Sequence, residues 1–74
     1  MTRRSTLLRD AVRALPERER RIVTRRHLAD EPSTLNELGD EMGISKERVR
    51  QLEERALARV SASVLGQSEA RAGA

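Results

Sequence analysis

The sequence predicts an all-α protein, a small helical bundle that ends in a helix-turn-helix. Apolar residues recur at steps of three and four along four segments, and helix-capping residues separate these segments. The chain has 74 residues, of which 36% are hydrophobic and none is aromatic, so it has room for one small domain and for no substrate-sized pocket. We expect an N-terminal extension over residues 1–5, the helix-turn-helix domain over 6–64 and a flexible C-terminal tail over 65–74.

The first two helices are expected over residues 6–14 and 16–28. The first segment repeats apolar residues at helical spacing, namely Leu7, Leu8, Val12 and Leu15. Pro16 separates the two helices, because proline disfavours a helical conformation of the residue before it and is tolerated in a first turn. The second helix turns Ile22 and Val23 inward. Its remaining surface carries a belt of arginines: Arg18, Arg20, Arg21, Arg25 and Arg26.

A third and a fourth helix follow, joined by a short turn that contains Gly43. Thr34 and Glu37 have the spacing of a capping box, which predicts that the third helix begins here. Gly43 suits the left-handed residue that ends a helix, and Ser45 suits the next N-cap. The fourth helix is expected from Lys46 to about residue 64. It carries one apolar stripe, made of Val49, Leu52, Ala56, Val60 and Val64.

The charge distribution predicts a partner that the protein meets with two separate faces. The net charge of +3 arises from basic blocks over residues 1–28 (+6) and 48–74 (+2) that flank an acidic block over 29–47 (−5). Of the 15 cations, 14 are arginine, whose planar guanidinium donates two hydrogen bonds at once to a phosphate or a guanine. A GC-rich genome would also account for the excess of arginine, although not for its placement. Without aromatic side chains, the chain lacks the stacking platforms of single-strand readers.

The residues around Gly43 match a helix-turn-helix better than an ordinary helical hairpin. Where the two helices of that motif cross closely, the chain has Gly39. Apolar residues occupy the packing positions of the motif: Leu38, Met42, Ile44, Val49 and Leu52. The second helix of such a motif lies in the DNA major groove and reads bases with its N-terminal residues.

The face of the fourth helix opposite its apolar stripe carries side chains that suit base edges: Lys46, Glu47, Arg50, Gln51 and Glu54. Arginine and lysine donate to guanine, glutamine pairs with adenine, and glutamate accepts from the cytosine amine. Arg48 and Arg55 lie on the flank, where phosphates would be. The alternative interpretation is a solvated face stabilised by Glu–Arg pairs, which the spacing of Arg50 and Glu54 allows.

Residues 33–60 resemble region 4 of the bacterial sigma factors, the domain that recognises the −35 promoter element. The most specific part is the segment ERVRQLEERAL over residues 47–57, and the segment LPERERRIV over 15–23 is similar to region 4.1. The loop DEPST over 30–34 looks most like that of the heat-shock sigma factors. A sigma factor also has a domain for the −10 element. These residues lack it, so we expect the chain to be one domain of a longer protein.

The resemblance implies base reading, phosphate contacts and a polymerase contact. The implied base readers are Lys46, Glu47, Arg50 and Gln51, and the implied phosphate contacts are Arg18, Arg26, Thr34 and Arg48. Apolar candidates for the flap of the polymerase β subunit are Leu15, Val23 and Leu28, together with Ile22. Core packing is the alternative for each of them, and for Ile22 it is at least as good an explanation. Two residues depart from the family pattern: Lys46 replaces an arginine, and Gly39 replaces an alanine at a cost in helix stability.

Three functions compete at this point. The first is a sigma region 4 that binds double-stranded promoter DNA and core RNA polymerase, with an anti-sigma factor as a further partner and a monomeric domain. The second is the DNA-binding domain of a response-regulator-type transcription factor, which rarely carries the Arg-Gln-Leu-Glu run that begins at Arg50. The third is a module that binds only proteins.

An enzyme is excluded by the inventory of side chains. His27 is the only imidazole, cysteine is absent, and the sequence contains neither a phosphate-binding loop nor a metal-ligand spacing. We therefore expect no catalytic residue, no metal and no cofactor. No apolar run is long enough for a signal peptide or a membrane span, and we expect a bacterial cytoplasmic protein that does not contact a membrane.

Overall fold

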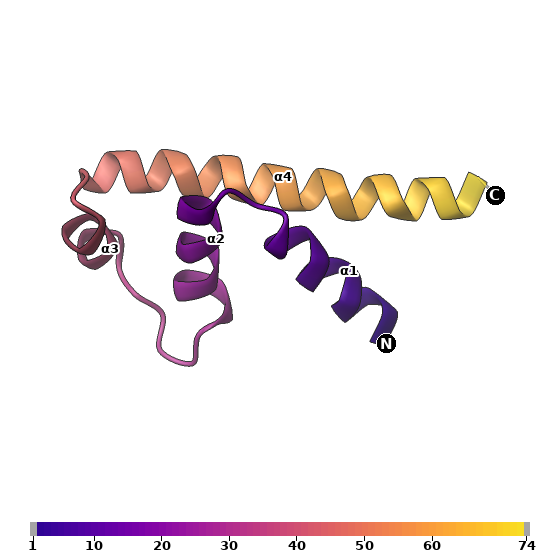
Figure 1. The fold of residues 1–74 in the computed structure, drawn as a ribbon, viewed down its shortest axis with the longest axis horizontal. Coiled ribbons are helices and arrows are strands. Elements are labelled where there is room, and N and C mark those ends of the chain that lie inside the picture. Colours follow the sequence, from indigo (N-terminus) through magenta and orange to yellow (C-terminus); the bar gives the residue numbers. More distant parts are fainter. Residues whose placement is uncertain (1, 74) are drawn as a thin grey trace.

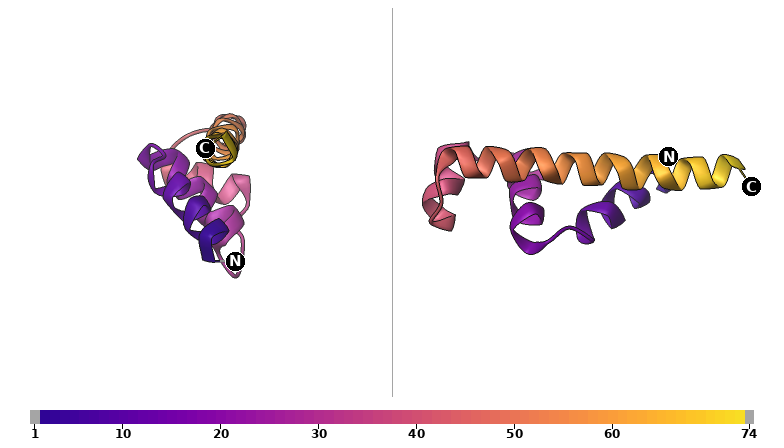
Figure 2. Two further views of the ribbon diagram at one scale, coloured as in Figure 1. Left: turned by 90° about the vertical axis from the view of Figure 1, so that its right-hand side faces the viewer. Right: turned by 90° about the horizontal axis from the view of Figure 1, so that it is seen from above.

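The computed structural model describes residues 2–73, with the side chains of residues 7–66. Its elements are α1 (Thr2–Arg13), α2 (Glu17–Val23), the π-helical segment η1 (Thr24–Leu28), α3 (Leu35–Met42) and α4 (Lys46–Gly73). Figure 1 shows α4 as one long helix, with the N-terminal elements along one side of it. The view along α4 in Figure 2 shows the same one-sided arrangement. Residues 2–73 contain no strand, and the predicted all-α fold with its helix-turn-helix is confirmed.

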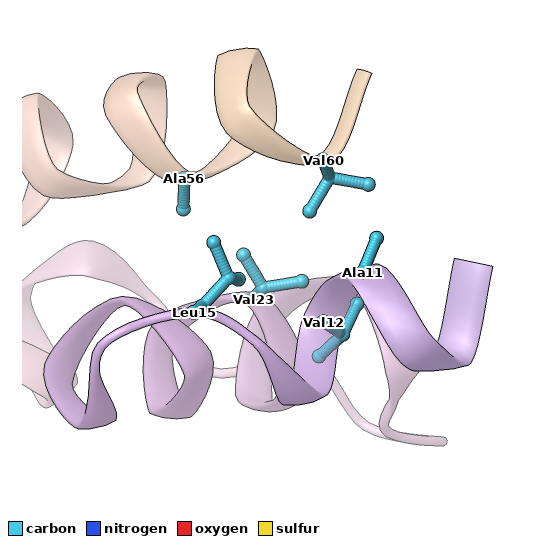
Figure 3. Packing of buried hydrophobic residues seen from close by; sticks show 6 residues of the cluster. All are labelled: Ala11, Val12, Leu15, Val23, Ala56 and Val60. Atoms are coloured by element: carbon cyan, nitrogen blue, oxygen red, sulfur yellow. The ribbon is translucent and has the colours of Figure 1, made fainter. Parts of the chain in front are cut away.

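Two apolar clusters hold the other elements against α4. The first joins α1, α2 and the middle of α4 through Ala11, Val12, Leu15, Val23, Ala56 and Val60. Figure 3 shows Leu15 and Val23 pointing from below toward Ala56. The second cluster joins α2, α3 and the first turns of α4 through Ile22, Leu38, Val49 and Leu52. Because α4 contributes to both clusters, it is the element against which every other helix is positioned.

Both outer helix ends differ from the predicted ones. α1 begins at Thr2 rather than at residue 6, and α4 continues past residue 64 to Gly73. Neither extension contains a proline, and Gly66, the glycine inside the longer α4, is tolerated within a helix at a modest cost. The expected helix ends were therefore wrong, because no residue at those positions stops a helix. The division of the chain at residues 5/6 and 64/65 stays a prediction.

The second predicted helix is not uniform. It is α-helical only from Glu17 to Val23 and then widens into η1. Its backbone is also tied to the loop that follows, since the amide of Ser33 donates to the carbonyl of Arg25 over 3.0 Å. Short π-helical turns often occur at functional sites, and here the wider turn brings two consecutive side chains, Arg26 and His27, to one carboxylate of α4.

Candidate nucleic-acid interface

The helix-turn-helix is bounded by the caps that the sequence predicts. The Thr34 hydroxyl accepts from the amide of Glu37 at 3.0 Å, and the Glu37 carboxylate accepts from the amide of Thr34 at 2.7 Å. Gly43 ends α3 in the left-handed conformation, with φ +71°. The Ser45 hydroxyl accepts from the amide of Arg48 at 3.0 Å and begins α4. These local hydrogen bonds satisfy amides that a helix leaves unpaired at its first turn.

Gly39 lies where α3 meets the turn. The Ile44 amide donates to the Gly39 carbonyl over 2.9 Å. A Cβ atom added to Gly39 would lie 2.7 Å from the Ile44 carbonyl oxygen, which is shorter than real Cβ contacts. Glycine at this position therefore lets the turn fold tightly onto α3. From the sequence, Gly39 is expected only to lower the stability of the helix. The structure adds a second role, because the absence of a Cβ atom allows this close approach.

The predicted reading face has the predicted orientation. Val49 and Ala56 are fully buried and Leu52 is nearly so, whereas the candidate base readers of α4 are exposed. The exposed side-chain fractions are 61% for Glu47 and 47% for Arg50. The first turns of α4 thus present Lys46, Glu47, Arg50 and Gln51 away from the protein core.

Arg50 is paired with a neighbouring carboxylate. Its Nε and Nη2 donate to the two carboxylate oxygens of Glu47 over 3.0 and 2.7 Å, and its Nη1 lies 3.6 Å from Glu54. The hydrogen bond from Arg50 holds the pKa of the Glu47 carboxyl below its ordinary value. The Glu–Arg pairs of the alternative interpretation are therefore present. An ion pair this exposed stabilises a helix only weakly, so it holds the guanidinium loosely.

The candidate phosphate contacts differ in their surroundings. Arg18 is exposed on α2, and Arg48 is half-buried, with its Nη1 3.4 Å from Gln51 Oε1. Thr34 uses its hydroxyl in the capping box. Arg26 is engaged more fully, because its Nε donates to Glu53 over 2.6 Å and its Nη1 donates to the Ser33 carbonyl over 2.9 Å.

Two carboxylates that the sequence pattern did not single out turn inward in the fold. Glu53 stands four residues after Val49, within the buried stripe of α4, and its side chain is 13% exposed. Glu19 on α2 is buried as well, with Oε1 3.3 Å from the Nε of Arg59. A glutamate at a core-facing helical position is rarely buried without a partner, so this placement was the signal that could have identified both.

The apolar candidates for a polymerase contact separate into two kinds. Leu15 and Val23 are 5% and 3% exposed within the first cluster, whereas Leu28 is 53% exposed at the end of η1. Leu28 borders a groove of about 410 Å³ between α1 and the α2–η1 segment. Its lining consists of Leu8, Arg9, Val12, Arg13, Arg20, Thr24 and Leu28, and is therefore apolar with an arginine rim.

Within the part of the chain that the structure describes, no cluster of His, Asp or Glu is arranged to hold a metal ion.

A comparison with known protein families decides the family. Residues 11–62 match the model of sigma-70 region 4, which covers most of the chain, from the end of α1 into α4. The chain belongs to the sigma-70 region 4 family. The matched residues include the whole of α2, η1 and α3 and the first part of α4.

Curated relatives of this region 4 domain are RNA polymerase sigma factors. The factor RpoH of Caulobacter vibrioides is 53% identical over 53 residues, which cover 72% of this chain and 18% of the relative. RpoH of Rhizobium radiobacter is 49% identical over 61 residues, covering 82% of this chain and 20% of the relative. The sigma-C factor of Myxococcus xanthus is 50% identical over 50 residues, 68% of this chain and 17% of the relative. The predicted resemblance to heat-shock sigma factors is thus confirmed by the RpoH relatives.

The chain spans about a fifth of the length of the curated relatives it matches. The structure therefore corresponds to region 4 of these relatives. No helix in the described part of the chain is both long and apolar enough to cross a membrane.

Proposed function

We propose that this region 4 domain recognises the −35 element of promoters in the DNA major groove and docks on core RNA polymerase during transcription initiation. The observation that carries the proposal is the reading face of α4. Lys46, Glu47, Arg50 and Gln51 are exposed together at the start of the second helix of the motif. That end of a recognition helix is where base edges are contacted. Family membership supports the same function.

Phosphate contacts would set the register of α4 in the groove. Arg18 is exposed on α2, and Arg48 lies beside the reading face on α4. The amino-terminal block of residues 1–28 adds a net charge of +6, which favours association with the phosphate backbone. Arg18→Ala is expected to weaken binding to all duplexes about equally and to reduce the salt dependence by about one unit.

The polymerase contact is assigned to the groove between α1 and η1. Leu8 and Leu28 are 42% and 53% exposed there, so they offer apolar surface to the β flap. Leu15 and Val23 were expected to share this role, but their side chains lie inside the first cluster and support the groove from within. The arginine rim of the groove suits a partner that is acidic at its edges.

A paired binding experiment tests both parts of the proposal. Affinity for a −35 duplex is measured against affinity for a scrambled duplex at one salt concentration, and binding to core polymerase is measured separately. The domain should prefer the −35 duplex, and Leu28→Gln, which adds no charge, should weaken polymerase binding while leaving DNA affinity unchanged. Equal affinity for the two duplexes would refute promoter recognition, and unchanged polymerase binding by the variant would refute the groove. Binding of an anti-sigma factor and the monomeric state stay predictions, the latter tested by sedimentation.

A further inference from the structure

One carboxylate joins three segments of the domain. Glu53 of α4 accepts hydrogen bonds from two consecutive residues of η1, from Arg26 Nε at 2.6 Å and from His27 Nε2 at 2.8 Å. The same Arg26 donates through Nη1 to the carbonyl of Ser33 at 2.9 Å. Ser33 immediately precedes Thr34, the N-cap of α3. Arg26 and Glu53 therefore connect η1 to both helices of the helix-turn-helix.

The surroundings of this junction are less exposed to water than those of the other ion pair that η1 makes with a helix. The side chains of Arg26 and Glu53 are 27% and 13% exposed, whereas Arg25 and Glu41, which join η1 to α3 over 2.8 Å, are 41% exposed each. Burial raises the pKa of the Glu53 carboxyl, but the hydrogen bonds from Arg26 and His27 outweigh burial and lower that pKa overall. A charged hydrogen bond in partly dry surroundings restrains its partners more than an exposed one does.

Glu53 is close to the reading face without being part of it. It follows Glu47 by six residues, which is ~9 Å along a rigid helix. Restraint of α4 at Glu53 therefore restrains the direction in which its first turns point. Base-reading side chains must be held within about 0.5 Å of their productive positions by supporting contacts.

We infer that Glu53 is a positioning residue for promoter reading, and that Arg26 acts on DNA through Glu53 rather than by contacting a phosphate. The inference rests on the proposed function, because it assigns how the reading helix is held. It also changes the role expected of Arg26, since a guanidinium that serves Glu53 and the Ser33 carbonyl has its Nε and Nη1 occupied. Loss of either partner should therefore affect recognition of the sequence rather than attraction to DNA.

A double-mutant cycle tests the inference. Arg26→Gln, Glu53→Gln and the double variant are compared with the parent domain in binding to −35 and scrambled duplexes across a salt series. The double variant keeps the net charge of the chain. We expect each of the three variants to reduce the ratio of the two affinities about tenfold, with the double variant no worse than the single ones. The salt dependence of scrambled-duplex binding by the double variant should be unchanged.

The opposite result identifies a phosphate contact. If Arg26 touches a phosphate, the double variant loses about 0.9 from the slope of log affinity against log salt and keeps its discrimination, which overturns the inference. The matched control is the double variant Arg25→Gln, Glu41→Gln, which breaks the exposed bridge from η1 to α3. It should keep the parental discrimination. An equal loss in this control would overturn the assignment to Glu53, because any bridge from η1 would then have the same effect.

Folding and function are kept separate in the design. Binding is measured at a temperature where circular dichroism shows every variant to be folded. If Arg26→Gln does not fold, Arg26→Lys is used as the test variant. Lysine keeps the positive charge but lacks the planar guanidinium that donates to two acceptors at once. Arg26→Lys should lose discrimination, and full parental discrimination in this variant would overturn the inference. A parent domain that binds both duplexes equally would instead refute promoter recognition itself, which is a distinct outcome.

Discussion

Replacing Arg50 by alanine should weaken binding to the −35 duplex much more than binding to a scrambled duplex. In the free domain, the guanidinium of Arg50 donates two hydrogen bonds to Glu47 and is 47% exposed. A bond network this open to water contributes little to folding, so the variant should fold as the parent does. The effect of the substitution should therefore appear in DNA binding.

The magnitude follows from the exchange that Arg50 makes on binding. It leaves a weak, solvated partner, Glu47, and gains two hydrogen bonds to one guanine. A bidentate contact of this kind corresponds to a loss of roughly 5- to 150-fold in affinity for the correct sequence. On scrambled DNA that guanine contact is missing, so the loss there should be severalfold at most.

The assay is a paired titration of labelled −35 and scrambled duplexes at one salt concentration. Arg9→Ala is the control, because Arg9 belongs to α1. This helix lies beside the later turns of α4, away from the first turns that carry the reading face (Figure 1). The control should leave the affinity ratio unchanged. Equal loss on both duplexes in Arg50→Ala would show that Arg50 contacts a phosphate and that the reading face is rotated from the position argued above.

Glu47→Ala should behave differently from Arg50→Ala in the same titration. It removes an exposed negative charge from a surface that faces phosphates, so affinity for the scrambled duplex should rise. It also removes an acceptor for the cytosine amine, so the affinity ratio should fall. An increased ratio would refute a reading role for Glu47.

Three further predictions concern the scaffold. Leu38→Ala should lower the free energy of unfolding by about 2–5 kcal/mol, because the side chain is fully buried, whereas the 59% exposed Leu65→Ala should change it by less than about 0.5 kcal/mol; urea denaturation checks both. Gly39→Leu should lower the melting temperature sharply and Gly66→Leu should not, since a Cβ meets the turn backbone at 2.7 Å only at Gly39. The lowered pKa of Glu53 contributes stability above about pH 4.3 that is lost as the pH falls below it. Melting at pH 7 and pH 3 should therefore show a smaller acid loss in Glu53→Gln than in the parent.

The elements that the sequence predicts well are those decided over a few residues. The Thr34 capping box, the left-handed Gly43 and the cap at Ser45 all form as expected, because each depends on hydrogen bonds or backbone angles within one turn. The buried face of α4 was also predicted correctly, because Val49 and Leu52 are three residues apart and therefore lie on the same face of a helix. The reading face is the complement of that stripe, so it could be located from the chain alone.

The tertiary structure decided which of several helical surfaces meet. Periodicity could not show that Leu15 and Val23 lie against Ala56 while Leu28 stays exposed, because all three residues are apolar and suit either place. It also could not show that Arg26 faces Glu53, since the two residues are 27 positions apart and belong to different elements. Contacts between distant segments depend on how whole helices pack. The local pattern determined the helices and the exposed face of α4, whereas the packing of η1 on α4 decided that Arg26 is engaged within the protein.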